Sequence, residues 1–333
     1  MMKAVRIRRH NAALISVLCL IFTAGILLAG TLALSQKGTF SVAAHVELQR
    51  SMFVAEGAAN RIQYLLAADR NLHPDDKPGQ VDYTGYEYDR FMADSVAHEL
   101  DYYGEKIGFT VNDAVSGWDM SSGNYEKVLN MISGQDDAGD DVIDLVNQVS
   151  HRLGDYLDAD ENIREYGQES GGYEDLEQKP LPRNGAMQYR EELLYIEGFG
   201  ELFPPDENGR LSSIRLIPPA NTSNLSGTAA LFSADRNTIR LQCDLSENEL
   251  DTVMDALDRW RKDKELLSDI LDEELLNKLN SGFSTVESGA YTVILYPPQS
   301  ELRPFRKLVF SYSGFEVDGP ADRMVRYMEW NYL

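Results

Sequence analysis

Side chains that could bind a metal ion recur at regular intervals between residues 158 and 169. Counting from Asp158, carboxylate or amide oxygens fall at positions 1, 3, 5 and 12, which are Asp158, Asp160, Asn162 and Glu169. Calcium prefers oxygen ligands, and this is the ligand spacing of the EF-hand calcium loop. Position 6 is Ile163, whereas an EF-hand has a glycine there to make its sharp turn. An EF-hand is therefore not expected, and a looser calcium loop remains as one interpretation.

The loop lies in an acidic segment of the chain. Between Asp136 and Asp175 there are 13 acidic residues and two arginines. So many carboxylates repel one another unless a cation or water separates them. Asp155, Glu174 and Asp175 are close enough in sequence to converge on the same ion. The alternative is a solvated acidic loop without an ion, and the spacing alone does not decide between the two.

Sequence signatures of common enzymes are absent from the chain. No H-E-x-x-H pair, no G-x-S-x-G turn and no P-loop occurs. The two cysteines cannot pair, because Cys19 lies in an apolar run and Cys243 in the acidic body. The histidines are scattered and form no metal-ligand pair: His10, His45, His73, His98 and His151. We expect no catalytic residue and no enzyme; a hydrolase built on two carboxylates, which has no sequence signature, is the weaker alternative.

The charge of the chain is unevenly placed. There are 31 Lys and Arg against 54 Asp and Glu, which gives a formal net charge of −23. The first nine positions are basic, with Lys3, Arg6, Arg8 and Arg9. Because a body this acidic repels phosphate backbones, no nucleic-acid binding is expected.

An apolar segment, residues 12–34, follows the basic N-terminus. It has 23 residues without a charge, and about 20 helical residues span a bilayer. The preceding basic residues predict a cytoplasmic N-terminus, with the rest of the chain outside. Three interpretations are open: a cleaved secretory signal, a plain signal anchor, or a prepilin-type signal. In the last, a basic leader is removed before the apolar helix and the helix is kept.

Hydrophobic periodicity predicts the elements that position these residues. One long helix runs from about Ala12 to Asp69, and its second half is amphipathic. Ser246 and Glu249 have the spacing of a capping box at the start of a helix. Further helices are predicted over residues 89–103, 124–133, 140–158, 188–196, 246–262 and 264–279. Strands are predicted over residues 106–111, 211–217, 291–296, 307–313 and 324–332. This order indicates an α+β fold with a helical insertion.

Several stretches, in their order along the chain, match the pattern of one known protein family. Residues 153–161 read LGDYLDADE, and residues 172–175 read GYED. These resemble the D-W-L-D-A-D-D/E and G-A-E-D runs of the K-type minor pseudopilins of the type II secretion system. Most pseudopilins have Glu at the fifth residue of the mature chain, whereas the K type lacks it. In this chain the corresponding residue is Ser16. Further likeness lies in residues 8–18, 53–59, 113–120 and 192–199 and in the strands after Ser288.

The resemblance implies an architecture. The expected fold is α+β, with a long N-terminal transmembrane and amphipathic helix and a pseudopilin α/β core interrupted by a large helical, SAM-like insertion. The implied parts are a leader at 1–11 that is removed between Asn11 and Ala12, a transmembrane helix at 12–34, the rest of the helix and the start of the core at 35–111, the insertion at 112–282, and the completing strands at 283–333.

The resemblance also implies a function and a location. The protein would be a structural subunit at the tip of the pseudopilus, in protein export across the outer membrane. It would cross the inner membrane once, with its C-terminal domain in the periplasm and a methylated mature N-terminus. Its partners would be the I- and J-type minor pseudopilins, the major pseudopilin, the prepilin peptidase and the inner-membrane secretion platform. The alternative is a membrane-anchored periplasmic binding or sensor module.

The last implication is bound calcium near the acidic loop. The resemblance assigns it to carboxylates only, which are Asp158, Asp160, Glu161, Glu174 and Asp175.

Overall fold

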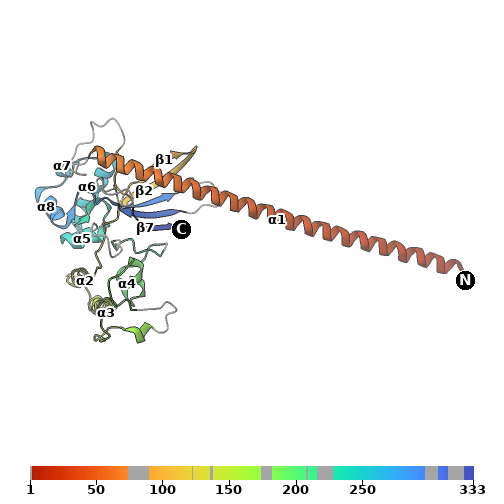
Figure 1. Cartoon of the computed structure of the whole chain (residues 1–333), viewed down its shortest axis with the longest axis horizontal. Coiled ribbons are helices and arrows are strands. Elements are labelled where there is room, and N and C mark those ends of the chain that lie inside the picture. The colour runs from red at the N-terminus through yellow and green to blue at the C-terminus, as the bar shows by residue number, and fades with distance from the viewer. Residues whose placement is uncertain are drawn as a thin grey trace. The chain divides into compact units, whose positions relative to one another are not determined.

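The computed structural model describes residues 2–73, 90–121, 123–135, 138–173, 182–207, 209–215, 228–296, 307–313 and 326–333. Contacts divide the described chain into an N-terminal unit, residues 1–56, and a body formed by residues 57–298 and 307–333. The N-terminal unit is part of helix α1, Met2–Leu72 (Figure 1). From Leu14 onward this helix is long and apolar enough to cross a membrane. The predicted long helix is confirmed, and it extends further at both ends, from Met2 instead of Ala12 and to Leu72 instead of Asp69.

The last turns of α1 pack on one face of a sheet. Ala58, Ala59 and Ile62 are fully buried. Gly57 lies so close to the ring of Tyr102 that an added Cβ would be 2.3 Å from its hydroxyl oxygen. Further along, the amide of Gln63 bonds the hydroxyl of Tyr327 at 2.9 Å. The helix thus contacts both the first and the last strand of the sheet.

The sheet has five antiparallel strands in the order β1-β2-β5-β6-β7. Its strands are β1 His98–Tyr102, β2 Glu105–Asp113, β5 Ala290–Tyr296, β6 Leu308–Ser313 and β7 Arg326–Tyr332. The strands predicted over residues 106–111, 291–296, 307–313 and 324–332 are confirmed. Since β2 pairs directly with β5, everything between Asp113 and Ala290 is inserted between two neighbouring strands.

The helix predicted over residues 89–103 is wrong, because its described part contains β1 and no helix. Tyr103 and Gly104 have φ of 56° and 79° and form the two-residue turn between β1 and β2. Positive φ at both central positions is typical of the hairpin turn that matches strand twist. Pairing with β2 therefore decides the conformation of this segment against its local helical pattern.

The insertion contains two apolar cores. The first joins α2 Tyr125–Ser133, α3 Asp140–Leu157, the 3-10 helices η1 Ser170–Tyr173 and η2 Arg190–Tyr195, and α4 Phe199–Leu202. Val149, Leu153 and Phe199 are fully buried there. The predicted helices over 124–133 and 140–158 are confirmed, and that over 188–196 is a 3-10 helix. The strand predicted over 211–217 is wrong, since its described residues form only one bridge, between Ile214 and Trp118.

The second core joins η4 Leu231–Ser233, α5 Arg236–Cys243, α6 Glu247–Asp263, α7 Leu267–Ile270 and α8 Glu273–Gly282, with the short parallel strands β3 Ala229–Ala230 and β4 Phe283–Ser284. The ring of Trp260 stacks on Phe232 at 3.8 Å. The capping box of Ser246 is present as predicted. The single helix predicted over 264–279 is instead two, because Asp272 is extended and its side chain caps a new helix by accepting from Leu275 N.

Candidate metal centre

The candidate centre begins where α3 ends. Asp158 has an extended backbone, and its N–H donates to Gly154 O at 3.0 Å, which closes the helix. The chain then turns back, since Asp160 Oδ1 accepts from Asn162 N at 2.8 Å. Gly172 N donates to Glu169 O at 2.7 Å, at the start of η1. The loop between α3 and η1 thus returns Glu169 to the end of the helix that carries Asp158.

Three carboxylates converge in this loop. One oxygen each of Asp158, Asp160 and Glu169 lies within 4.8 Å of the other two. Asp160 is exposed and Asp158 half-buried, whereas Glu169 is only 4% exposed. These are positions 1, 3 and 12 of the spacing that predicted a calcium loop. The structure therefore brings together the three acidic positions of that pattern.

The buried polar atoms around these carboxylates lack partners. Among the described residues, nine buried side-chain nitrogen or oxygen atoms have no hydrogen-bond partner, and five of them lie here. They are Asp158 Oδ1, Glu169 Oε1 and Oε2, Tyr173 Oη and Asn184 Oδ1. All five are oxygens that can face a cation. Buried oxygens without a partner are rare in folded proteins, so this group is chemically suited to a cation.

The electrostatics of Glu169 fit the same conclusion. Burial, together with the charges of Asp155, Glu161, Asp158 and Asp160, raises the pKa of Glu169 to about 7. A carboxylate that is costly to ionise alone becomes favourable beside a divalent cation. The residues that converge here offer only oxygen ligands, which suit calcium better than zinc or copper.

Arg164 neutralises the inner side of the loop. Its Nη1 pairs with Asp155 Oδ1, and with Asp158 Oδ2 at 2.6 Å. Its backbone N–H also donates to Asp155 Oδ2 at 3.1 Å, and the Asp155 side chain is fully buried. One oxygen of Asp158 is therefore held by arginine, which leaves the other oxygen, Oδ1, for an ion. Gly167 allows this packing, because an added Cβ would be 1.8 Å from Asp155 Oδ2.

The predicted ligands fall into three groups. Asp158 and Asp160 lie together in the centre. Glu161 faces other partners, since its Oε2 accepts from Ser170 Oγ at 2.7 Å and its Oε1 from Asn184 Nδ2 at 3.2 Å. Glu161 therefore bonds the surrounding loops, and its role as an ion ligand stays a prediction. The other two predicted ligands, Glu174 and Asp175, lie outside the described residues.

Asn184 is the residue that the sequence reasoning missed. It comes 15 positions after Glu169, so no local spacing marks it. Its backbone has φ of 47°, its N–H donates to Tyr156 O at 3.0 Å, and its amide reaches Glu161. The predicted processing residues Asn11 and Ala12 lie in α1 at positions where side chains are not described. Cleavage between them stays a prediction.

A buried hydrogen-bond network around Glu192 holds the segment that carries Asn184 in place. Glu192 Oε2 accepts from Tyr156 Oη at 3.0 Å and from Arg183 Nε at 2.9 Å. Its Oε1 accepts from the backbone of Gln188 at 2.9 Å. Both carboxylate oxygens of a 1% exposed side chain are thus satisfied. This network ties the segment around Asn184 to α3.

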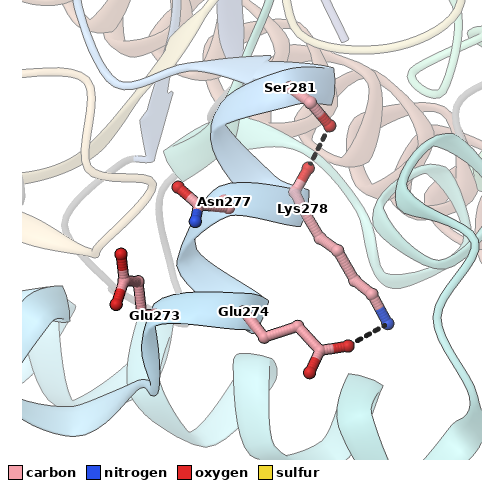
Figure 2. A pocket seen from close by; sticks show the side chains of 5 residues that line it. All are labelled: Glu273, Glu274, Asn277, Lys278 and Ser281. Carbon is pink, nitrogen blue, oxygen red and sulfur yellow. Dashed lines mark hydrogen bonds and ion pairs between the residues drawn. The ribbon is translucent and has the colours of Figure 1, made fainter.

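Apart from the candidate metal centre, a surface hollow of about 610 Å³ lies along α8. Figure 2 shows that its lining side chains all rise from that one helix. Lys278 pairs there with Glu274 at 3.8 Å, and with Glu249 of α6 at 2.6 Å. Since the described side chains that line it all come from α8, this hollow is an ion-paired helix face.

The segment that builds the metal centre also carries the family likeness. Residues 141–203 match the family model of the type II secretion system protein K. The resemblance to the K-type family is confirmed. The matched segment contains α3, the acidic loop, Asn184 and η2, so the residues that converge in the centre lie within the part shared with protein K.

One solved structure has a similar fold. The chain is similar to a chain of the crystal structure of the GspK-GspI-GspJ complex from the type 2 secretion system of enterotoxigenic Escherichia coli. The two are 12% identical, with a TM-score of 0.51, and the match covers 85% of this chain and 96% of the other. At this identity the likeness shows the fold, a long apolar N-terminal helix followed by mixed helix and sheet. A comparison with curated proteins finds no match.

Proposed function

We propose that this protein is a structural subunit of a type II secretion pseudopilus, the K-type minor pseudopilin, and not an enzyme. The observation that carries the proposal is the match of residues 141–203 to protein K. The long apolar helix and the interrupted sheet support it, because a pseudopilin must rest in a membrane before it packs into a fibre.

The subunit would stand at the tip of the pseudopilus. In this position the insertion between β2 and β5 makes a body too wide for another subunit to add above it. The body would lie in the periplasm, and α1 would cross the inner membrane once. Its neighbours would be I- and J-type minor pseudopilins, which is supported by the similar chain being part of a GspK-GspI-GspJ complex. It would also meet the major pseudopilin, the prepilin peptidase and the inner-membrane secretion platform.

Co-purification tests the proposal. The full chain, extracted in detergent, should hold the I- and J-type pseudopilins of its own secretion system in a stable complex, and deletion of its gene should stop secretion. N-terminal sequencing of the membrane form should begin at Ala12, with a methylated amine. A chain that starts at Met1 and binds neither partner would instead favour a membrane-anchored binding or sensor module.

The acidic loop would bind calcium and so order this part of the insertion. Asp158, Asp160 and Glu169 would supply charged oxygens, and Asn184 a neutral one. Calorimetry of the full chain should show calcium binding, and Asp158→Ala with Asp160→Ala should abolish it and weaken the tip complex. Asp255→Ala, an exposed acid on α6, is the matched control. Unchanged calcium binding in the double variant would refute the assignment of the site.

A further inference from the structure

A row of polar side chains crosses the sheet on the face that is not covered by α1. Asn112, Thr292, Ser311 and Glu329 are direct neighbours on β2, β5, β6 and β7. The hydroxyls of Thr292 and Ser311 are 2.9 Å apart, and Ser311 Oγ donates to Glu329 Oε2 at 2.9 Å. Side chains alternate between the two faces of a strand, so this row faces away from the buried Val111 and Val293. A polar row of this kind needs polar groups above it.

Two arginines of the insertion meet one end of the row. Arg190 Nη2 pairs with Glu329 Oε1 at 3.2 Å, and Arg210 Nη2 pairs with Glu329 Oε2 at 2.5 Å. Arg190 is otherwise satisfied, because its Nη1 donates to Ile214 O at 3.0 Å and its Nε to Glu191 at 3.1 Å. One carboxylate of the last strand thus holds two cations of the insertion.

A cavity of about 340 Å³ lies beside this junction. Asn112 and Thr292 contribute to its lining from the sheet, and Arg190, Arg210 and Arg261 from the insertion. Serine side chains supply much of the remaining wall, among them Ser212 and Ser213. The cavity is therefore lined by hydrogen-bonding groups from strands and helices that are far apart in sequence.

Two of these arginines have a buried donor without a partner. Arg210 Nε and Arg261 Nε are both buried and unbonded, and Arg210 is only 9% exposed. The head of Arg261 is fixed, since Nη1 donates to Asp258 and Nη2 to Phe232 O, each at 3.0 Å. In the metal centre the unpartnered atoms are oxygens, whereas here they are N–H donors. Since buried polar atoms are rarely left without a partner, unpartnered oxygens favour a cation in the acidic loop, and unpartnered N–H groups favour a hydrogen-bond acceptor in this cavity.

The charges of the cavity decide which acceptor fits. Asp113, Asp206 and Asp235 line it as well, so they balance the three arginines in formal charge. These acids have their own donors: Asp206 accepts from Arg210 N at 3.0 Å, and Asp235 from Thr238 N at 3.0 Å. Asp113 accepts from Val115 N at 2.9 Å, and from Ser288 N and Oγ at 2.7 Å each. Because Glu329 also pairs with Arg190 and Arg210, the arginines bring no excess of positive charge to the cavity. A planar, singly charged acceptor, which guanidinium N–H groups bind well, therefore fits it better than a doubly charged phosphate.

We propose that this cavity binds a carboxylate through Arg210 and Arg261, either from a small free acid or from the end of a partner's chain. The carboxylate oxygens would accept from the two Nε–H groups, and the serine hydroxyls would complete its hydrogen bonds. This site is separate from the metal centre and does not depend on calcium.

Ligand-observed NMR tests the proposal with the full chain in detergent. Saturation should pass from the protein to the methyl group of acetate, and to N-acetylglycylglycine if a chain end is accommodated. Arg210→Gln and Arg261→Gln should each weaken binding on the order of tenfold or more, as expected for the loss of a charged hydrogen bond. Arg210→Lys keeps the charge but not the directed donor, and should also weaken binding.

Controls keep the test decisive. Arg236→Gln removes an arginine that pairs with Asp251 at 2.7 Å and does not line the cavity, so it should bind like wild type. Ser212→Phe places a bulky ring at an exposed lining position and should block entry without altering the core. Circular dichroism shows which variants fold. No transfer to acetate in wild type, equal transfer in wild type and Arg210→Gln, or tighter binding of inorganic phosphate than of acetate would each overturn the proposal.

Discussion

Glu169→Gln is the substitution with the clearest expected signature. Glu169 is buried, both of its oxygens lack partners, and it lies within 4.8 Å of two other carboxylates. Glutamine has the same shape but no charge. Without calcium the change removes repulsion, and with calcium it removes a ligand. Without calcium the variant should therefore be more stable than wild type. When calcium is added, it should gain less stability than wild type gains.

The size of the first effect follows from Coulomb's law. At 4.8 Å, two like charges repel by about 1 kcal/mol in bulk water and by about 3.5 kcal/mol at the effective dielectric of a protein surface. Asp158 is partly neutralised by Arg164, so one such pair, with Asp160, is the fair count. Because the pKa of Glu169 is raised to about 7, the comparison belongs at pH 8, where the carboxylate is ionised. We expect the free energy of unfolding without calcium to rise by about 1–3 kcal/mol.

Thermal and urea unfolding, followed by circular dichroism with a chelator and then with calcium, measures both effects. Wild type should gain stability as calcium is added, and Glu169→Gln should gain much less. Glu165→Gln is the matched control, since Glu165 is an exposed acid of the same loop outside the cluster. The reasoning is refuted if Glu169→Gln is less stable than wild type in chelator, or if calcium stabilises both proteins equally.

Three further predictions follow from the structure. Gly167→Ala should lower the free energy of unfolding by about 1–3 kcal/mol through its clash with Asp155, whereas Gly171→Ala, where a Cβ meets nothing within 4 Å, should not; thermal unfolding compares the two. Burial raises the pKa of Glu287 from 4.5 to about 7, so between these pH values the folded protein keeps a proton that the unfolded chain has lost. The free energy of unfolding should therefore fall by at most about 3 kcal/mol as the pH rises from about 4.5 to 7. Glu287→Gln should flatten this fall in a series of unfolding measurements across that range. Glu329→Gln leaves two buried arginines without their shared carboxylate, so it should lower the free energy of unfolding by about 2–4 kcal/mol and speed proteolysis of the insertion. A variant that resists proteolysis as well as wild type would contradict this prediction.

Elements with strong local signals could be predicted from the sequence. Helix α6 has a capping box, and α3 has acids in its first turn and a clear apolar face. The strands after Ser288 have β-branched and aromatic residues between turns. In these elements the local preference agrees with the final packing, so no knowledge of distant contacts was needed.

Elements that depend on distant partners were predicted wrongly. Strand β1 exists because it pairs with β2 through a Tyr103-Gly104 turn, a less common choice than Asn-Gly. Residues 211–217 have a strand pattern, yet Ile214 only bridges Trp118. Tertiary pairing thus makes a strand where the local pattern predicts a helix, and its absence leaves described residues with a strand pattern outside the sheet.

The same distinction holds for the metal centre. Asp158, Asp160 and Glu169 are close in sequence, so ligand spacing could predict that they meet. Asn184 lies beside Asp160 and Glu161 because Glu192 of η2 ties its segment to α3. Glu161 has the right chemistry but bonds Ser170 and Asn184 instead. Spacing identifies ligands within one loop, whereas ligands supplied by a second segment require the fold.

The two polar centres are linked by one short element. Helix η2 carries Glu192, which holds the Asn184 segment near the metal centre through Tyr156 and Arg183. Two residues earlier, η2 carries Arg190, which pairs with Glu329 on the last strand of the sheet. Because η2 has only six residues, it cannot shift at one end without moving the other. An ion bound in the acidic loop would therefore also fix how the first core of the insertion meets the sheet.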